Sequence, residues 1–281
     1  MTDNPAKIII RNKTFEWGKR TYLMGVLNVT PDSFSDGGDF NTIESALAQA
    51  ENMVKSGVDI IDIGGQSTRP GAAEISLEEE IDRVIPVVQM LRQKADIFSS
   101  VPISVDTTRA QVAKAAIEAG ADIVNDISGA TFDSEMLSTV AQLQVPIILM
   151  HIRGTPQTMQ KLTDYQDLIG EILDFLESRI VAALDAGIDK SQIIIDPGIG
   201  FAKTYNQNLE ILRQLPKFRG LDCPILVGVS RKSFIGHILN QPEAKQRIWA
   251  IANSADILRI HDVREMHDVC LVADAIFRNQ S

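Results

Sequence analysis

The feature of this sequence that most constrains its fold is a regular alternation of two kinds of segment. Short apolar runs rich in Ile and Val alternate with longer segments in which apolar residues recur at helical spacing. The short runs are apolar on both faces, which indicates strands of a parallel sheet buried between helices. The predicted strands are Tyr22–Val29, Val58–Ile63, Pro102–Asp106, Asp122–Asp126, Pro146–His151, Ile193–Asp196, Pro224–Ser230 and Asp256–His261.

Amphipathic segments between these strands are predicted to be helices. Three connections, SGVDIIDI, AGADIVNDI and NSADILRI, place a small or Gly-containing turn directly before a strand. Such turns fit helix C-termini that need a residue in the left-handed conformation. The predicted helices are Thr42–Ser56, Leu77–Lys94, Gln111–Ala119, Met136–Leu143, Asp167–Ala186, Gln207–Leu215 and Arg264–Phe277.

Eight strand–helix units in a chain of 281 residues fit an α/β fold of the closed (β/α)8 TIM-barrel type, which typically takes about 250 residues. A doubly wound open sheet is the competing architecture. The opening IIIRNKTFEWG predicts a short N-terminal β-hairpin that covers the lower end of the barrel. No interdomain linker or low-complexity segment interrupts the pattern, so residues 1–281 are expected to form a single domain.

The charge and the cysteine content narrow the function classes. The formal net charge of −10 argues against sequence-independent binding to nucleic acid or to anionic lipid. The two cysteines, Cys223 and Cys270, are far apart and form no metal-binding or redox spacing. The first residues lack a basic region followed by an apolar stretch, and no apolar run approaches the ~20 residues of a membrane span. We therefore expect a cytoplasmic protein with no membrane or nucleic-acid partner.

Polar residues stand at the ends of seven of the eight predicted strands. In a barrel of this type the carboxyl ends of all strands surround one mouth, where catalytic groups lie. A single Asp at a strand end is most often a helix N-cap. Here that interpretation would have to apply independently at seven strand ends. Burying several carboxylates and carboxamides together is costly unless a polar ligand satisfies them. The residues are Asn28, Asp62, Asp106, Asn125 with Asp126, Asp196, Ser230 to Lys232, and Arg259 with His261 and Asp262.

These residues divide into two chemical sets. The first contains flat carboxylate and amide ends, which suit the edge of a heteroaromatic ring with amino, imino and carbonyl groups. Its members are Asp106, Asn125, Asp196 and Lys232. The second contains donors and cations, as a phosphate or diphosphate requires. Its members are Asn28, Arg69, Arg259 and His261.

Other motifs do not support competing chemistries. DPGIGFAK lacks the third Gly of a dinucleotide fingerprint, and VGVSRKSFIG lacks the order of a nucleotide P-loop. Ser230 has no general base beside it in the sequence, which argues against a serine nucleophile. His151 ends a strand, but the other three His are scattered, so a His-based metal site is not expected. Met150 is expected to pack against the bound ring.

The sequence as a whole resembles the dihydropteroate synthase family. The resemblance covers nearly the entire chain, and eight segments in order carry it. They are MGVLNVTPDSFSDGG, DIGGQSTRPGA, SVDTTRA, VNDISGA, LMHIRGTPQTMQ, IIIDPGIGFAK, PILVGVSRKSFIGHIL and LRIHDV. It implies a TIM barrel that joins hydroxymethyl-dihydropterin diphosphate to 4-aminobenzoate and releases pyrophosphate. It also implies a homodimer and Mg²⁺ at the diphosphate.

The resemblance assigns a role to each matching residue. Asp106, Asn125, Asp196 and Lys232 would bind the pterin edge, with Asp62 deep in the same pocket. Further residues would wall the ring or allow its approach, namely Met150, Phe201 and Gly228. The diphosphate site would consist of Asn28, Arg69, Arg259 and His261, with Asn28 also reaching the metal. The aminobenzoate pocket would be shaped by Thr68, Pro70, Ser233 and Phe34.

The stretch LNVTPDSFSDGG, which follows the first strand, is expected to be a lid. Its Gly and Ser residues would allow it to open, and Phe34 would pack on the aminobenzoate ring once the lid closes. The alternative is an ordinary surface loop, although an exposed Phe in a polar loop weighs against it. For the chemistry, a dihydropterin delocalises positive charge at its CH₂ carbon, so the diphosphate is expected to leave before the amine attacks.

The sequence departs from the family pattern before the last strand. Only AIANSA separates Trp249 from Asp256, so roughly two turns of the helix between strands seven and eight are missing, at about 3.6 residues per turn. This shortening affects a region that contributes to the family's dimer interface. Gln66 stands where many relatives carry Glu. Two other functions stay open: a methyl-folate:corrinoid methyltransferase, and a catalytically silent pterin-binding module.

Overall fold

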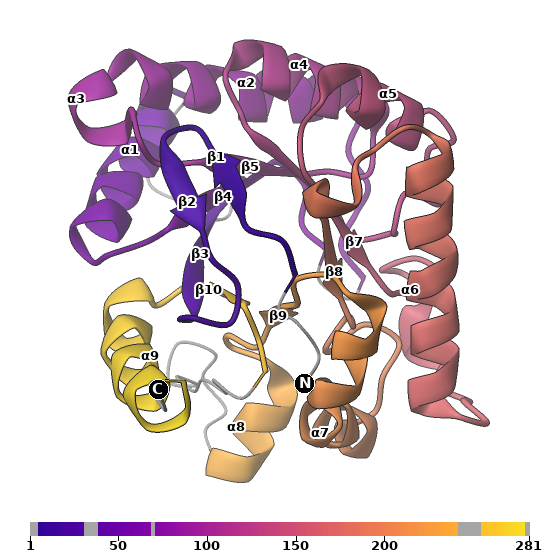
Figure 1. The fold of residues 1–281 in the computed structure, drawn as a ribbon. Helices are drawn as coiled ribbons and strands as arrows, with labels where there is room; N and C mark the ends of the chain where they lie inside the picture. Colours follow the sequence, from indigo (N-terminus) through magenta and orange to yellow (C-terminus); the bar gives the residue numbers. More distant parts are fainter. Residues whose placement is uncertain (1–4, 31–38, 69–70, 241–253, 279–281) are drawn as a thin grey trace.

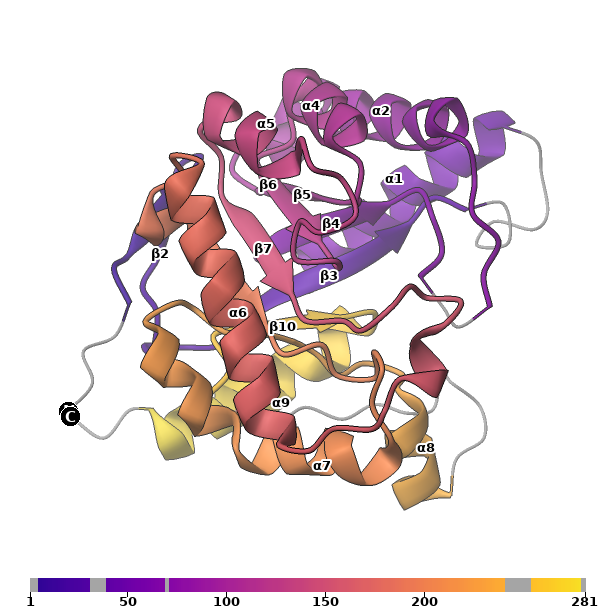
Figure 2. The same ribbon diagram turned by 90° about the vertical axis from the view of Figure 1, so that its right-hand side faces the viewer.

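Eight parallel strands form the central sheet (Figures 1 and 2). The computed structural model describes residues 5–30, 39–68, 71–240 and 254–278. Within this part of the chain the strand order is β8-β7-β6-β5-β4-β3-β10-β9. The strands are β3 (Tyr22–Asn28), β4 (Ile60–Gly64), β5 (Ile103–Asp106), β6 (Ile123–Asp126), β7 (Ile147–Met150), β8 (Ile193–Asp196), β9 (Leu226–Gly228) and β10 (Ile257–Ile260).

The two outermost strands of this order meet, and their meeting nearly closes the barrel. Ile195 of β8 forms a parallel bridge with Ile225, which directly precedes β9. The N–H of Ile195 also donates to the carbonyl of Pro224 at 2.9 Å. This closure confirms the predicted TIM barrel and rules out the doubly wound open sheet, whose outermost strands would not meet.

Helices surround the barrel, and most of them lie where the sequence predicts them. The segment predicted as Leu77–Lys94 is followed by a further short helix, and the predicted list lacks the helix after β9. The helices are α1 (Asp39–Lys55), α2 (Leu77–Gln93), α3 (Ala95–Phe98), α4 (Ala110–Ala119), α5 (Met136–Leu143), α6 (Leu168–Asp185), α7 (Tyr205–Arg213), α8 (Ser233–Leu239) and α9 (Val263–Phe277). The 3-10 turns are η2 (Met159–Lys161), η3 (Lys190–Gln192) and η4 (Leu215–Leu221). Among the described residues, no helix is both long and apolar enough to cross a membrane.

The predicted hairpin closes the lower end of the barrel (Figure 1). It consists of β1 (Ile8–Ile10) and β2 (Lys13–Phe15), which pair antiparallel. The ring of Phe15 lies 4.8 Å from that of Tyr22 and 5.6 Å from that of Trp17, between ring centroids. These rings pack against one inward-pointing apolar layer of the barrel. Its strand residues are Met24, Ile60, Ile123, Ile148, Ile194, Leu226 and Ile257.

The layer above this apolar plug is polar because side chains on a strand alternate with a period of two. Two residues beyond each plug residue, the next inward-pointing side chain lies one layer closer to the carboxyl ends of the strands. These positions hold Val26, Asp62, Asn125, Met150, Asp196, Gly228 and Arg259. The alternation therefore places Asp62, Asn125, Asp196 and Arg259 directly above the apolar floor, and Asn28 and Asp106 lie one step further along their strands. These six side chains, with the other inward-pointing residues beside them, are called the polar layer below.

Three Asp residues join the opposite, lower ends of the strands. Each directly precedes a strand and accepts the backbone N–H of a neighbouring strand: Leu23 to Asp59 at 2.9 Å, Ile103 to Asp122 at 2.8 Å and Ile225 to Asp256 at 2.9 Å. The turns before them contain left-handed residues as predicted, at Gly57, Gly120 and Ser254. Each Asp also pairs with cationic side chains, namely Lys13 and Arg20, Arg11 and Arg92, and Arg219.

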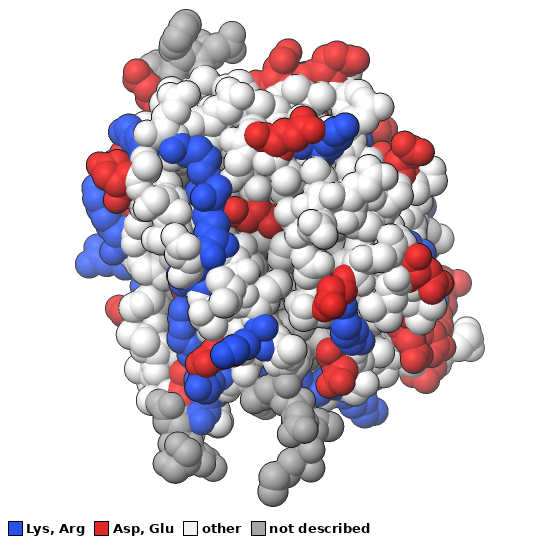
Figure 3. Space-filling model, turned by 45° about the horizontal axis from the view of Figure 1, so that its top comes forward, with Lys and Arg blue, Asp and Glu red and all other residues white. Residues whose placement is uncertain are grey.

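Not every expectation falls on described residues. Between β9 and β10 the structure describes α8 and residues 254–256, whereas the shortened helix expected before Asp256 lies outside the described residues. Of the segment expected to act as a lid, residues 31–38, with Phe34, also lie outside them. On the surface, one face carries a line of Lys and Arg side chains between scattered Asp and Glu side chains (Figure 3). The net charge of −10 is therefore not a uniform acidic coat.

Candidate active site

Arg259 connects three strands in the polar layer. Its Nε donates to Oδ2 of Asp62 at 2.6 Å, and its Nη2 donates to Oδ2 of Asp106 at 2.6 Å. The same Asp62 oxygen accepts from Nδ2 of Asn125 at 3.1 Å. β10 thus contacts β4 and β5 across the barrel interior, and the predicted pterin set and the predicted diphosphate set meet at one guanidinium.

Asn28 and Asp106 are neighbours at the same level. The register pairs Asn28 with Gly64 and Gly64 with Asp106. Gly64 has no side chain, and a Cβ there would lie 3.5 Å from the Asp106 Cβ and 3.9 Å from the Asn28 Oδ1. Because Gly64 has no side chain, space remains between the Asn28 amide and the Asp106 carboxylate. The sequence assigns Asn28 to the diphosphate and Asp106 to the pterin.

Burial decides the charge state of this cluster. Burial, opposed by Arg259, raises the pKa of Asp106 to about 7. Burial acts to lower the pKa of Arg259, but Asp62 and Asp106 outweigh it and hold that pKa above its ordinary value. Oδ1 of Asp62 is buried without a hydrogen-bond partner among the described residues. A buried carboxylate oxygen of this kind is available to a ligand donor.

Asp196 and Lys232 form the other half of the layer. Oδ1 of Asp196 accepts the N–H of Gly198 at 2.7 Å. Burial raises the pKa of Asp196 to about 6, against the Gly198 N–H and the charges of Lys232 and Arg259. Burial also lowers the pKa of Lys232 to about 8, although Asp196 raises it. Asp196, Lys232 and Arg259 therefore act on one another electrostatically at one end of the barrel.

The residues expected to wall the ring lie beside this pair. Nζ of Lys232 lies 4.6 Å from the centroid of the Phe201 ring. Phe201 packs on a small apolar cluster that includes Met150 and Met159. A Cβ at Gly228, which pairs in register with Arg259, would meet nothing within 4 Å, so space is open in front of this strand. Met150, Phe201 and Gly228 are thus brought together with the polar layer.

His261 is a neutral donor or acceptor in this structure rather than a cation. Its Nδ1 lies 3.2 Å from Oγ of Ser230. Burial, followed by the charges of Arg231 and Arg259, lowers the pKa of His261 to about 3. Arg231 itself pairs with Asp262, with its Nε 3.1 Å from the carboxylate. The sequence indicated the position of His261 but could not indicate its charge, which depends on burial.

Arg109 joins two loops at the mouth of the barrel, and the sequence alone did not identify it. Its Nη2 donates to the carbonyl of Ile75 at 2.7 Å, and its Nη1 donates to Oε2 of the buried Glu80 at 2.7 Å. Oγ1 of Thr107 donates to the other Glu80 oxygen at 2.6 Å. These bonds tie the loop after β4 to the loop after β5. The only sequence signal is the SVDTTRA segment, because the contact joins residues 34 positions apart.

The remaining predicted residues are less constrained. Thr68 is half-buried, and Ser233 is the exposed first residue of α8. Arg69, Pro70 and Phe34 lie outside the described residues. No group of three or more His, Cys, Asp or Glu within the described part of the chain could hold a metal ion. Asn28 itself offers a cation one amide oxygen.

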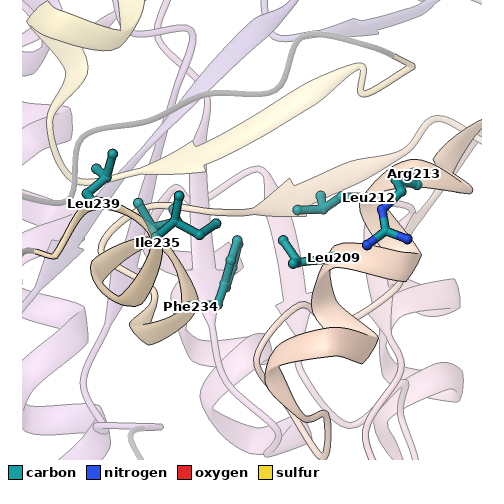
Figure 4. Close-up of a pocket in the computed structure, with 7 residues that line it drawn as sticks. Leu209, Leu212, Arg213, Phe234, Ile235 and Leu239 are labelled. Atoms are coloured by element: carbon teal, nitrogen blue, oxygen red, sulfur yellow. The ribbon is translucent and has the colours of Figure 1, made fainter.

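An apolar hollow of about 370 Å³ lies elsewhere, between α7 and α8 (Figure 4). None of its lining residues belongs to the polar layer. They are Leu209, Leu212, Arg213, Phe234, Ile235, Ile238 and Leu239. Arg213 is the one charged residue among them, and the others offer no side-chain hydrogen-bonding group for the edge of a polar ring. The hollow is therefore not the candidate active site.

Comparisons with known proteins agree with this geometry. The protein family described as pterin binding enzyme matches residues 24–261. The dihydropteroate synthase of a Synechocystis species is 58% identical over 282 residues, which cover 98% of this chain and 96% of that protein.

Solved structures are similar over the same extent. The Clostridium difficile dihydropteroate synthase, crystallised in the presence of pteroic acid, is 43% identical with a TM-score of 0.87. The match covers 94% of this chain and 100% of that one. The Xanthomonas albilineans dihydropteroate synthase with 4-aminobenzoic acid is 38% identical with a TM-score of 0.85, over 97% of this chain and 98% of that one.

Proposed function

This chain belongs to the pterin-binding enzyme family, and we propose that it catalyses the dihydropteroate synthase reaction. It condenses 6-hydroxymethyl-7,8-dihydropterin diphosphate with 4-aminobenzoate, giving 7,8-dihydropteroate and pyrophosphate. The observation that carries the proposal is the polar layer, in which Arg259 donates to Asp62 and Asp106 and Asn125 donates to the same Asp62 carboxylate. Asp196 interacts electrostatically with Arg259. Relatives that are 58% and 43% identical over 98% of this chain are dihydropteroate synthases.

The pterin is bound by its edge in this layer. Carboxylates of Asp106 and Asp196 accept N–H bonds from the amino and ring nitrogens, and Asn125 offers both a donor and an acceptor. Lys232 donates to the ring carbonyl or a ring nitrogen while Phe201 and Met150 pack on the ring faces. Ionised carboxylates also favour the cationic pterin that forms when the diphosphate leaves.

The leaving group departs toward the cationic side of the mouth. The bond between the pterin CH₂ and the diphosphate oxygen breaks with its electron pair on oxygen, and the pterin ring delocalises the resulting positive charge. Arg259, with Arg69 and His261, stabilises the departing pyrophosphate. The aniline nitrogen of 4-aminobenzoate then attacks the CH₂ carbon and loses a proton. No covalent enzyme intermediate is required.

Mg²⁺ belongs to the proposal as a partner of the diphosphate. Asn28 would supply an amide oxygen, which is a hard ligand suited to this ion, and the phosphate oxygens would supply further ligands. Bound there, Mg²⁺ would neutralise charge on the leaving group. Thr68, Pro70, Ser233 and Phe34 are proposed for the aminobenzoate side.

We further propose a homodimer and a cytoplasmic location. Apolar side chains on α9 are strongly exposed, with Val272 62% and Ile276 56% accessible. Ile238 of the α7–α8 hollow is 55% accessible as well. Val272 and Ile276 are one helical turn apart on α9, and exposed apolar side chains that lie together are typical of subunit interfaces. Sedimentation at several protein concentrations tests the dimer, and monomer at micromolar concentration would contradict it.

A turnover assay tests the function. The protein is incubated with the pterin diphosphate, 4-aminobenzoate and Mg²⁺, and dihydropteroate and pyrophosphate are measured together. Equal amounts of both products support the synthase. Pterin affinity without pyrophosphate release would instead identify a silent binding module. Methyl transfer from a methyl-folate to a corrinoid, without synthase activity, would identify the methyltransferase.

A further inference from the structure

We propose that Lys203 is a positioning residue that fixes the Phe201 ring as one wall of the pterin site, an inference that rests on the proposed function. Lys203 is 4% exposed and is the last residue of the segment DPGIGFAK, which follows β8. In the sequence, this segment contributes to the family resemblance and lacks the pattern of a dinucleotide motif, but it assigns no role to Lys203.

The amine of Lys203 contacts two groups in this part of the barrel. Its Nζ donates to the carbonyl of Phe201 at 2.9 Å and lies 3.0 Å from Nδ1 of His151. His151 directly follows β7, and its N–H donates to the carbonyl of Asp196 at 2.9 Å. Lys203 therefore connects the Phe201 loop to the end of β7 and, through His151, to β8.

The ring of His151 is a rigid support for this contact. It packs edge-on against Phe175, with 5.0 Å between ring centroids. Burial, followed by the charge of Lys203, lowers the pKa of His151 to about 2, so the ring is neutral at physiological pH. With the Lys203 amine as the donor, Nδ1 accepts and the proton of the neutral ring resides on Nε2.

Phe201 is held at two points by two different lysines. Lys203 holds its carbonyl, and Nζ of Lys232 lies 4.6 Å from its ring centroid. Gly198 and Gly200 allow the close packing: a Cβ at Gly198 would lie 2.0 Å from the His151 carbonyl oxygen, and one at Gly200 would lie 3.2 Å from Nζ of Lys232. Both glycines have positive φ angles. Loss of the Lys203 amine would therefore release the Phe201 carbonyl, and with it the backbone that carries the ring.

Burying the Lys203 amine costs desolvation free energy, which stability alone does not explain. Among the described residues it forms no ion pair with a carboxylate at contact distance. Burial lowers its pKa to about 7, and Asp196 opposes this only from a distance. An apolar side chain of the same length would fill the site without desolvating an amine. Its cost is explained if the two hydrogen bonds set the geometry of the substrate wall.

The test compares Lys203→Met with Lys190→Met. Lys190 is the matched control, because its Nζ also donates to a backbone carbonyl, that of Leu221 at 2.8 Å, at the opposite end of β8. For Lys203→Met we expect a roughly tenfold higher KM for the pterin diphosphate, since the Phe201 carbonyl and His151 lose their partner. The KM for 4-aminobenzoate and kcat should change less than about twofold. Lys190→Met should match wild type in all three.

Wild-type kinetics indistinguishable from those of a folded Lys203→Met variant would overturn the inference while leaving the synthase assignment intact. Absence of turnover in wild type would instead remove the assignment. If Lys203→Met does not fold, ¹⁵N NMR of the histidine rings in wild type decides. An unprotonated, hydrogen-bonded Nδ1 on His151 supports the contact, and a protonated Nδ1 contradicts it.

Discussion

Arg259 and Asp106 face each other across the barrel, with Nη2 of the arginine 2.6 Å from Oδ2 of the carboxylate. The pair links a residue of β10 to one of β5, and it joins the two halves of the site. The arginine that we propose for the leaving group also acts on the pKa of the carboxylate that we propose for the pterin. Several consequences of this coupling can be measured.

Arg259→Ala should weaken binding of a pterin that carries no diphosphate, and not only of the diphosphate substrate. Without the guanidinium, Asp62 and Asp106 remain buried and unpaired, and the pKa of Asp106 rises further above about 7. The loss of such a partner costs on the order of 3 kcal/mol of folding free energy. Urea unfolding and fluorescence titration with the free pterin measure both effects.

Arg219→Ala is the control for this experiment. Arg219 also pairs with a buried carboxylate, that of Asp256, but at the lower end of the barrel. It should lose folding free energy while keeping wild-type pterin affinity. Unchanged pterin affinity in Arg259→Ala would show that Arg259 does not influence pterin binding by Asp106, which contradicts the proposed coupling.

Asp196→Asn should stabilise the ligand-free protein and weaken pterin binding. The folded pKa of Asp196, about 6, lies above its ordinary value of 3.8. Its contribution to stability is therefore fully present below about pH 4 and is lost as the pH rises through about 6, because the unfolded state ionises first. Replacing the carboxylate by an amide removes that loss, which is on the order of 2–3 kcal/mol at pH 7.

Urea unfolding of Asp196→Asn at pH 4 and pH 7 checks this prediction. The variant should exceed wild type at pH 7 and match it near pH 4. Asp189→Asn is a control of opposite sign, because hydrogen bonds from Ser191 lower the pKa of that exposed carboxyl. A less stable Asp196→Asn at pH 7 would show that the carboxylate is not destabilising.

His261 should become more basic when an anion binds beside it. In the free protein its pKa is lowered to about 3 by burial and by Arg231 and Arg259, so the ring is neutral at pH 7. Pyrophosphate would offset the neighbouring cations and raise the pKa. NMR titration of the four His, assigned with His261→Gln, measures this. An ordinary pKa in the free protein, unaffected by pyrophosphate, would argue against His261 in the diphosphate site.

Mg²⁺ should bind weakly alone and more tightly with pyrophosphate. Asn28 offers one amide oxygen, and the described residues contain no cluster of three potential ligands around it. The ion therefore depends on phosphate oxygens. Calorimetry with and without pyrophosphate should show strong coupling, which Asn28→Ala reduces. Tight Mg²⁺ binding without pyrophosphate would place the metal at a different site.

The sequence predicted the barrel and the membership of the polar layer because both follow from local periodicity. Ile60 and Asp62, or Ile257 and Arg259, are two residues apart on one strand, so the apolar plug determines which polar side chains point inward. The hairpin, the left-handed turn residues and the strand ends are local features of the same kind. Each could be inferred before any tertiary contact was known.

The partners of these side chains could not be inferred in this way. Asp106 and Arg259 are 153 positions apart, and their contact depends on the closed circle of strands. The sequence therefore assigned them to separate substrate groups. The neutral state of His261 and the Lys203–His151 contact depend on burial, which no local pattern reports.

Positional isotope exchange tests most directly whether this mouth releases the diphosphate before the amine attacks. The pterin diphosphate is labelled with ¹⁸O at the oxygen that joins the pterin CH₂ to the first phosphorus. It is incubated with the protein and Mg²⁺ in the absence of 4-aminobenzoate. Departure and return of pyrophosphate should scramble the label into non-bridging positions of the recovered substrate. Retention of the label at the bridge, in a preparation that forms dihydropteroate once 4-aminobenzoate is added, would contradict departure before attack.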